Sequence, residues 1–286
     1  MPRYVRVHTL EDALAHLVAG PFRVIAGGTD VFPALVDGAP MREAMLDISG
    51  ITALRGIGFD EEASAWRLGA LTTWADVQRA RMVPPWFATL RRAAREVGGV
   101  QIQAVGTVAG NLCNASPAAD GVVPLLALDA RVEIAGPRGV RVEPLASFIT
   151  GVRRTTRTPD ELVTGILVPE PGRPGVSDFL KLGARHSLVI SIAMVAVVLW
   201  QDSDGAVGEA AVAVGACSPV AVRLTDLEAR LVGLRPGVDD LAAQVREADG
   251  DALSPIDDVR ATAAYRREAA LVLIRRALTR CAEVWP

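Results

Sequence analysis

The sequence predicts an α+β protein, with an N-terminal α/β part and a C-terminal antiparallel sheet covered by helices. In the N-terminal part, the apolar stretch 22–26 runs into two glycines and then a helical stretch at 31–36, which is the order of an α/β unit. Beyond residue 174, long runs of Val, Ile, Leu and Ala are separated by turn residues, as in an antiparallel sheet. The proline-rich segment 169–174 marks the boundary between the two parts.

The N-terminal part is expected to alternate short strands and helices. Its first helix begins after Thr9 and ends at Gly20, because apolar residues recur at helical spacing between them. The remaining expected elements are strands at 22–26, 44–48, 54–59 and 66–70, helices at 31–36, 73–81, 86–97 and 121–128, and a hairpin at 131–135 and 140–143.

The C-terminal part is expected to contain three strands followed by three helices. The strands are predicted at 178–184, 188–200 and 206–216, and the helices at 225–232, 239–248 and 259–284. In the last helix one face is apolar: Ala270, Leu271, Leu273, Ile274, Ala277, Leu278 and Cys281.

Composition excludes several classes of protein. Of the 286 residues, 50% are hydrophobic and 22% are charged, which excludes intrinsic disorder. A net charge of −3 gives no general attraction for nucleic acid. The most hydrophobic run, 188–200, is too short to cross a bilayer, and residues 1–10 lack the apolar core of a signal peptide.

Cysteines and basic residues carry further expectations. Cys113, Cys217 and Cys281 are odd in number and widely spaced, which argues against a disulfide framework, a structural zinc site and an iron–sulfur cluster in this chain. A reduced, cytoplasmic protein is therefore expected. Lys181 is the single lysine among 30 basic residues. The arginine clusters are expected to be mostly solvated helix faces: Arg91, Arg92 and Arg95; Arg153, Arg154 and Arg157; Arg275 and Arg276.

Familiar catalytic motifs are absent from the sequence. There is no Walker A segment, no G-x-G-x-x-G opening the first α/β unit and no G-x-S-x-G nucleophile elbow, and the three histidines lack metal-ligand spacing. Kinase and hydrolase functions are therefore excluded, and no catalytic residue or metal ligand is assigned to this chain.

Two glycine-bearing segments remain as candidates for binding an anion. The first is Ala26-Gly27-Gly28-Thr29-Asp30, between a strand and a helix, and the second is Thr107-Val108-Ala109-Gly110-Asn111. Backbone N–H groups in such loops can cradle a phosphate, and together the two could hold a pyrophosphate. Each taken alone is also compatible with an ordinary tight turn.

Five segments in a fixed order carry a family resemblance. They are A-G-G-T-D at 26–30, T-V-A-G-N-L-C-N-A-S-P-A-A-D at 107–120, E-L-V-T-G-I-L-V-P at 161–169, F-L-K-L-G-A-R at 179–185 and D-V-R-A-T-A-A-Y-R-R at 258–267. The ordered set resembles the FAD-binding medium subunit of the xanthine dehydrogenase and carbon monoxide dehydrogenase family of molybdenum hydroxylases. The resemblance runs from about residue 5 to residue 278.

The resemblance implies a domain organisation. Residues 1–171 would form a PCMH-type FAD-binding domain of two α/β lobes, about 1–55 and 56–171. Residues 175–286 would form a second α+β domain like the C-terminal domain of the carbon monoxide dehydrogenase flavoprotein.

The resemblance also implies the residues that contact FAD. In the first and second segments they are Val24, Ile25, Ala26, Gly27, Gly28, Thr29, Asp30, Val31, Thr107, Val108, Ala109, Gly110 and Asn111, on the pyrophosphate and ribose. Asp120 would lie near the ribityl or ribose hydroxyls, the backbone around Val163 would line the cofactor, and Lys181 would approach the flavin ring. For Asp120, a helix N-cap for residues 121–128 is an alternative or additional role.

Two positions depart from the family pattern. Ala109 stands where the family usually has the first glycine of T-x-G-G-N, and its methyl group narrows the space for a phosphate. Gln103 stands where many members have an arginine, so a charge contact is missing.

The implied function is electron transfer within a three-subunit oxidoreductase. A large partner subunit with molybdopterin would hydroxylate the substrate, expected to be a purine or another N-heteroaromatic compound. A small partner subunit with two [2Fe–2S] clusters would pass electrons to FAD in this chain, and an external acceptor would receive them. A dimer of heterotrimers, a heterohexamer, is implied. The alternatives are a structural subunit without FAD and a free-standing flavoprotein oxidoreductase.

Overall fold

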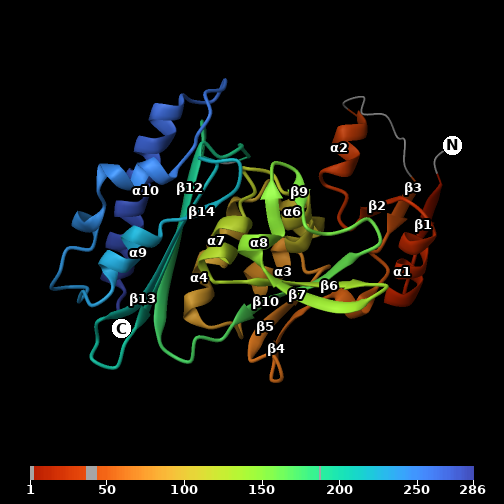
Figure 1. The fold of residues 1–286 in the computed structure, drawn as a ribbon, viewed down its shortest axis with the longest axis horizontal. Coiled ribbons are helices and arrows are strands. Elements are labelled where there is room, and N and C mark those ends of the chain that lie inside the picture. Colours follow the sequence, from red (N-terminus) through yellow and green to blue (C-terminus); the bar gives the residue numbers. More distant parts are fainter. Residues whose placement is uncertain (1–2, 37–43, 187) are drawn as a thin grey trace.

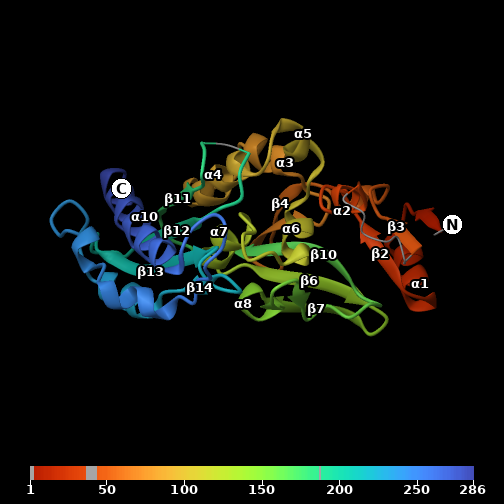
Figure 2. The ribbon, with the colours of Figure 1, turned by 90° about the horizontal axis from the view of Figure 1, so that it is seen from above.

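Three sheets follow one another along the molecule in the computed structural model, which describes residues 3–36, 44–186 and 188–286. A three-stranded sheet lies at the N-terminal end, a five-stranded sheet in the middle and a four-stranded sheet at the far end (Figures 1 and 2). The predicted α+β class is confirmed. Among the described residues, no helix is both long enough and apolar enough to cross a membrane.

The first sheet is the parallel α/β unit that the glycine segment predicts. Its strands are β1 (Tyr4–Arg6), β2 (Phe22–Ile25) and β3 (Ala44–Asp47), in the order β1-β3-β2. Helix α1 (Leu10–Ala19) begins where the Thr9 hydroxyl accepts a hydrogen bond from the Asp12 backbone N–H at 3.1 Å. The short helix α2 (Val31–Val36) begins three residues after Gly28.

The middle sheet is antiparallel, in the order β4-β5-β10-β6-β7. Its strands are β4 (Ile57–Asp60), β5 (Ala65–Gly69), β6 (Arg131–Gly136), β7 (Gly139–Pro144) and β10 (Leu162–Pro169). The expected strand at 54–59 is wrong at its start, because a 3₁₀ turn, η1 (Thr52–Leu54), precedes β4. No strand was expected at β10, whose first seven residues are buried on both faces and so lack an alternating pattern.

Short helices pack around the middle sheet. They are η2 (Pro85–Phe87), α3 (Trp74–Arg79), α4 (Ala88–Glu96), α5 (Val100–Val105), α6 (Val108–Asn114), α7 (Val122–Ala127) and α8 (Leu145–Phe148), with a small hairpin of β8 (Ile149–Gly151) and β9 (Arg154–Thr155). They pack through almost fully buried side chains that include Trp74, Phe87, Leu112 and Leu125. The segment 107–111 was expected to be a loop and is instead the N-cap and first turn of α6.

The C-terminal sheet is antiparallel, in the order β11-β12-β13-β14. Its strands are β11 (Gly175–Leu182), β12 (Ala193–Gln201), β13 (Val207–Gly215) and β14 (Val222–Arg223). Helices α4 and α7 contact the sheet from the middle of the molecule, while α9 (Thr225–Leu231) and α10 (Ala263–Glu283) contact it from outside. The expected strand 188–200 is too long, because the chain enters β12 only at residue 193.

The last three predicted helices have different outcomes. Helix α9 is confirmed, and α10 buries the predicted apolar face but begins at Ala263, where Thr262 caps it. The helix expected at 239–248 is wrong: the chain forms two 3₁₀ segments, η3 (Ala242–Gln244) and η4 (Glu247–Ala252). Asp249 turns back to accept the Arg246 backbone N–H at 2.8 Å and pairs with Arg230, which favours the tight turn over a continuous helix.

Candidate functional site

Gly27 packs the first glycine-bearing segment against the backbone just before the second one. A Cβ atom built on Gly27 would lie 1.9 Å from the Val105 carbonyl oxygen and 3.0 Å from the Gly106 Cα. A side chain therefore cannot fit, and the turn after β2 lies directly on the backbone that leads into α6. Gly28 adopts a φ of +70°, a left-handed conformation that glycine takes without strain.

The second segment is shaped by a helix cap. The Thr107 hydroxyl accepts a hydrogen bond from the Gly110 backbone N–H at 3.0 Å and so fixes the first turn of α6. Ala109 lies in this turn with 3% of its surface exposed, and its φ is not positive. The methyl group of Ala109, at a position where the family usually has a glycine, is therefore accommodated without backbone strain.

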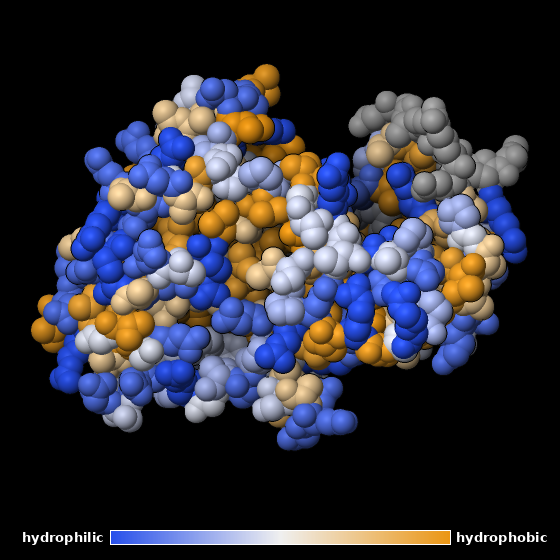
Figure 3. All heavy atoms as spheres, in the orientation of Figure 1, coloured by the Kyte–Doolittle hydropathy of each residue, from blue (hydrophilic) through white to orange (hydrophobic). Residues whose placement is uncertain are grey.

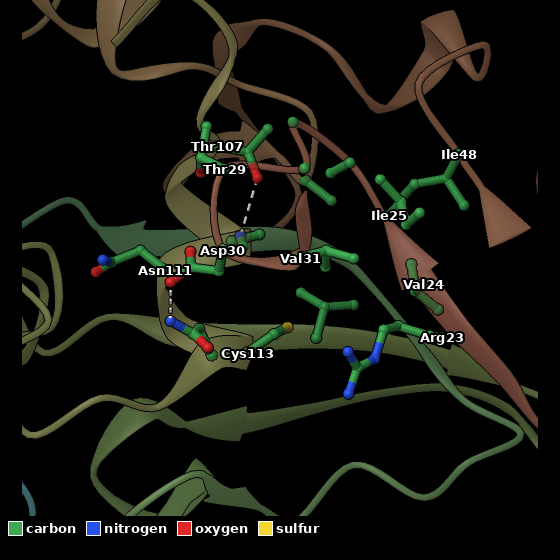
Figure 4. Close-up of a pocket in the computed structure, with 18 of the residues that line it drawn as sticks. Arg23, Val24, Ile25, Thr29, Asp30, Val31, Ile48, Thr107, Asn111 and Cys113 are labelled. Atoms are coloured by element: carbon green, nitrogen blue, oxygen red, sulfur yellow. Dashed lines mark hydrogen bonds between the residues drawn. The ribbon is translucent and has the colours of Figure 1, made fainter. Parts of the chain in front are cut away.

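A large cleft opens where the two segments meet. Its volume is about 1290 Å³, beyond the roughly 300–1,000 Å³ of ordinary small-molecule pockets. Figure 3 shows the upper surface hollowed to the right of the C-terminal part. In Figure 4, Val24 and Ile25 approach the cleft from β2, while Thr107, Asn111 and Cys113 approach it from α6.

The charged residues that line the cleft are mainly positive. Four arginines contribute to it, Arg23, Arg153, Arg154 and Arg157, whereas Asp30 is the acidic residue among the described lining residues. The Arg157 guanidinium is held in place, because Nη1 donates to the Thr158 and Glu161 carbonyl oxygens at 2.9 and 2.7 Å. Such a lining suits an anionic ligand.

Most of the predicted site residues meet in this cleft. Val24, Ile25, Ala26, Gly27, Gly28, Thr29, Asp30, Val31, Thr107, Ala109, Gly110, Asn111 and Val163 line it. Val108 does not, because its side chain is fully buried in the core. Asp120 and Lys181 lie outside the lining as well.

Asp120 and Lys181 form a buried ion pair. The Lys181 Nζ lies 2.8 Å from Asp120 Oδ2 and also donates to the Glu96 carbonyl oxygen at 3.2 Å. The Ser191 hydroxyl donates to Asp120 Oδ1 at 2.7 Å. Burial raises the pKa of Asp120, while the charge of Lys181 and these hydrogen bonds oppose the shift.

Asp120 is not the cap of the following helix. The N-cap position of α7 is Gly121, which makes no side-chain capping bond. The Gly121 backbone N–H donates instead to Asn111 Oδ1 at 3.1 Å, so a predicted site residue ties α6 to the start of α7.

Several lining residues were not predicted as site residues, namely Arg23, Cys113, Asn114, Arg153, Arg154 and Arg157. The cluster from residue 153 to 157 was expected to be a solvated helix face, but Arg153 and Arg154 belong to the β8–β9 hairpin and Arg157 follows it. Its signal in the sequence was three arginines within five residues and no acidic residue until Asp160.

Comparisons with known proteins identify the family of this fold. Residues 1–171 match the FAD binding domain in molybdopterin dehydrogenase. The chain belongs to this family. Residues 178–281 match the C-terminal domain of the CO dehydrogenase flavoprotein. The chain is thus an FAD-binding subunit of the molybdenum hydroxylase family, an oxidoreductase, and the resemblance found in the sequence is confirmed.

Individual relatives cover most of the chain. The xanthine dehydrogenase FAD-binding subunit of Escherichia coli O157:H7 is 33% identical over 227 residues, 79% of this chain and 77% of that protein. The nicotine 6-hydroxylase medium subunit of Paenarthrobacter nicotinovorans is 29% identical over 280 residues, 96% of this chain and 95% of that protein. The structure of reconstituted CO dehydrogenase from Oligotropha carboxidovorans aligns with a TM-score of 0.88 at 26% identity, covering 99% and 98% of the two chains.

The cleft fits the cofactor of the family. The pyrophosphate of FAD carries two negative charges. The cleft offers a large volume, four lining arginines and glycine backbone at Gly27, where no side chain fits. The chemistry of the residues present and the family assignment therefore agree.

Proposed function

We propose that FAD binds in the cleft between β2 and α6, with its pyrophosphate and ribose against the segments 24–31 and 107–111. The close approach of Gly27 to the Val105 carbonyl oxygen carries this proposal, because it places the first segment against the backbone that leads directly into the second. Backbone N–H groups of both segments donate to the phosphate oxygens, and the lining arginines balance their charge. Val163, in β10, contributes the floor of the cleft.

Asp120 and Lys181 are proposed to act at the flavin end of the cofactor. Lys181 approaches the flavin ring as a compact ammonium, and Asp120 lies near the ribityl or ribose hydroxyls. Because the two side chains form an ion pair, the positive charge felt by the ring is partly offset, and Asp120 fixes where the ammonium lies.

The proposed role of the subunit is electron transfer within a larger enzyme. When bound, FAD supplies the redox chemistry: it takes electrons from [2Fe–2S] clusters of a small partner subunit and gives them to an external acceptor. A large partner subunit with molybdopterin carries out hydroxylation, and two heterotrimers associate. Among the described residues no cluster of metal ligands exists in this chain.

The proposed substrate of the enzyme is a purine or another N-heteroaromatic compound. Relatives named for xanthine and for nicotine support this class. The free thiols of Cys113, Cys217 and Cys281 support a reducing, cytoplasmic location. The proposed domains are residues 1–171, with lobes of about 1–55 and 56–171, and residues 175–286; the two family matches and the end of β10 at Pro169 support this division.

Purification of the chain with its partners, followed by flavin and metal analysis, tests the proposal. We expect a complex of three different chains with one FAD per copy of this chain, together with molybdenum and iron. A complex with molybdenum and iron but no flavin would favour the structural subunit. A yellow chain that purifies alone and reduces its own substrate would favour the free-standing flavoprotein.

A further inference from the structure

A chain of side-chain hydrogen bonds closes one rim of the cleft. Asn114, at the C-terminal end of α6, donates through Nδ2 to Asp30 Oδ1 at 2.5 Å, drawn as a dashed line from Asp30 in Figure 4. The Arg153 guanidinium donates to the Asn114 carbonyl oxygen at 3.3 Å and also to Asn114 Oδ1. All three residues line the cleft. The contacts join the glycine segment after β2, the end of α6 and the β8–β9 hairpin, which are distant in sequence.

Two non-glycine residues with a positive φ lie at the same place. Ala115 has a φ of +44° and Arg153 a φ of +58°, a left-handed region that residues with a side chain rarely adopt. The Arg153 backbone N–H donates to the Ala115 carbonyl oxygen at 2.8 Å, so the two strained residues are bonded to each other. Strain of this kind persists where surrounding contacts hold it, and it gathers at ligand clamps.

Asn114 is chemically suited to its central position. Its amide nitrogen donates to the Asp30 carboxylate while its amide oxygen accepts from the Arg153 guanidinium, so one side chain uses both ends. An aspartate at this position could still accept from Arg153 but would repel Asp30. The bond from Asn114 also fixes the Asp30 carboxylate, whose Oδ2 has no hydrogen bond with any described residue.

We propose that Arg153, Asn114 and Asp30 form a latch that ties the β8–β9 hairpin to the first glycine segment across bound FAD and slows its release. The proposal rests on FAD occupying this cleft. Asn114 and Arg153 are positioning residues: they hold Asp30 and the hairpin, and the latch must open for the cofactor to leave. The hydrogen bonds among these three side chains lie at the exposed rim of the cleft, so the packing of the core does not depend on them.

The test measures the rate of FAD release from the purified complex, followed by flavin fluorescence after dilution. The variants are Asn114→Ala, Asn114→Asp and Arg153→Ala, with Arg131→Ala as the matched control because Arg131 is an exposed arginine of β6 outside the cleft. We expect release about three- to tenfold faster in the three latch variants, the range for one lost hydrogen bond. Arg131→Ala should release FAD at the wild-type rate.

A second measurement separates a latch from a merely structural contact. The urea midpoint of the FAD-free chain should be the same in wild type and in all variants. Release at the wild-type rate in the latch variants would overturn the latch and leave FAD binding intact. The latch would also be overturned if FAD release were faster only in variants whose urea midpoint is lowered in proportion. A wild-type complex that holds no FAD would overturn the latch together with the proposed function.

Discussion

Lys181 and Asp120 link the two parts of the molecule through one buried ion pair. Lys181 lies on β11 of the C-terminal sheet, and Asp120 lies just before α7 in the N-terminal part, with 2.8 Å between Nζ and Oδ2. Their side chains are only 7% and 12% exposed. Because both charges are largely removed from water, each is costly to bury without the other.

Loss of the lysine should therefore destabilise the fold. Lys181→Met leaves the Asp120 carboxylate buried with Ser191 as its remaining side-chain partner, and we expect a loss of about 3 kcal/mol in the free energy of unfolding. The double variant Lys181→Met, Asp120→Asn should recover a large part of this loss, because no buried charge remains. Urea unfolding of both variants measures the difference, and equal stability of the two would contradict the account.

The same variant should acquire a characteristic pH dependence. Burial raises the pKa of Asp120 above the ordinary 3.8, and removing Lys181 lets it rise further. A carboxyl group whose pKa is raised in the folded state favours folding while it is protonated. The free energy of unfolding therefore falls as the pH rises through that pKa. The deficit of Lys181→Met against wild type should be small near pH 4 and grow toward neutral pH. The double variant should show no such trend.

The flavin potential should report the charge of Lys181. Its loss leaves a net negative charge at the flavin end of the proposed site, which disfavours the reduced, negatively charged flavin. We expect the midpoint potential of Lys181→Met to fall by on the order of 30 mV, equivalent to about 1.4 kcal/mol for a two-electron couple. An unchanged potential with unchanged turnover of the acceptor would show that Lys181 has no influence on the ring.

Gly27→Ala should separate the two segments that form the cleft. Its Cβ would meet the Val105 carbonyl oxygen at 1.9 Å, so backbone must move. We expect a loss of about 2 kcal/mol in stability and at least roughly tenfold weaker FAD binding. The control is Gly58→Ala, at an exposed position of β4 where a Cβ meets nothing within 4 Å. FAD titration of both proteins checks this, and wild-type affinity in Gly27→Ala would be the contrary result.

Glu161 should contribute stability that acid removes. Its carboxylate accepts from Arg141 Nε and Nη2 at 3.0 and 2.9 Å and from the Thr158 backbone N–H at 3.0 Å, and Arg141 is the main cause that lowers the pKa of Glu161 to about 2. A carboxyl with a lowered pKa stabilises the fold above its ordinary 4.5, and this contribution is lost as the pH falls toward 2.

Glu161→Gln therefore should cost about 2 kcal/mol at neutral pH, and the difference from wild type should shrink below pH 4.5 and vanish as the pH falls toward 2. Urea midpoints measured across this range test the expectation. Exposed Glu62→Gln serves as the control and should change nothing. A deficit of Glu161→Gln that persists in acid would contradict the ion pair as its cause.

Local patterns account for the parts of the fold that the sequence predicted. Helix α1 carries its cap at Thr9 and its apolar residues at helical spacing, so neighbouring residues alone define it. The apolar face of α10 follows from the same periodicity. In contrast β10 lies in the centre of its sheet with both faces covered, and a strand buried on both sides has no alternation to detect.

The site was predictable to the extent that it depends on local backbone. Glycines at residues 27 and 28 and the cap at Thr107 are signals within a few residues of each other. Asn114 and Arg153 were not predicted as site residues, because their roles arise only when the hairpin folds back onto the end of α6. Likewise the partner of Lys181 is fixed by packing between segments 61 residues apart.

A density map of the complex with FAD bound tests the central claim most directly. The account predicts the FAD pyrophosphate between the segment 24–31 and the first turn of α6, with the lining arginines around the phosphates. Gly27 should remain packed against the Val105 carbonyl oxygen. FAD bound to this chain outside that cleft, or held entirely by a partner subunit, would contradict it.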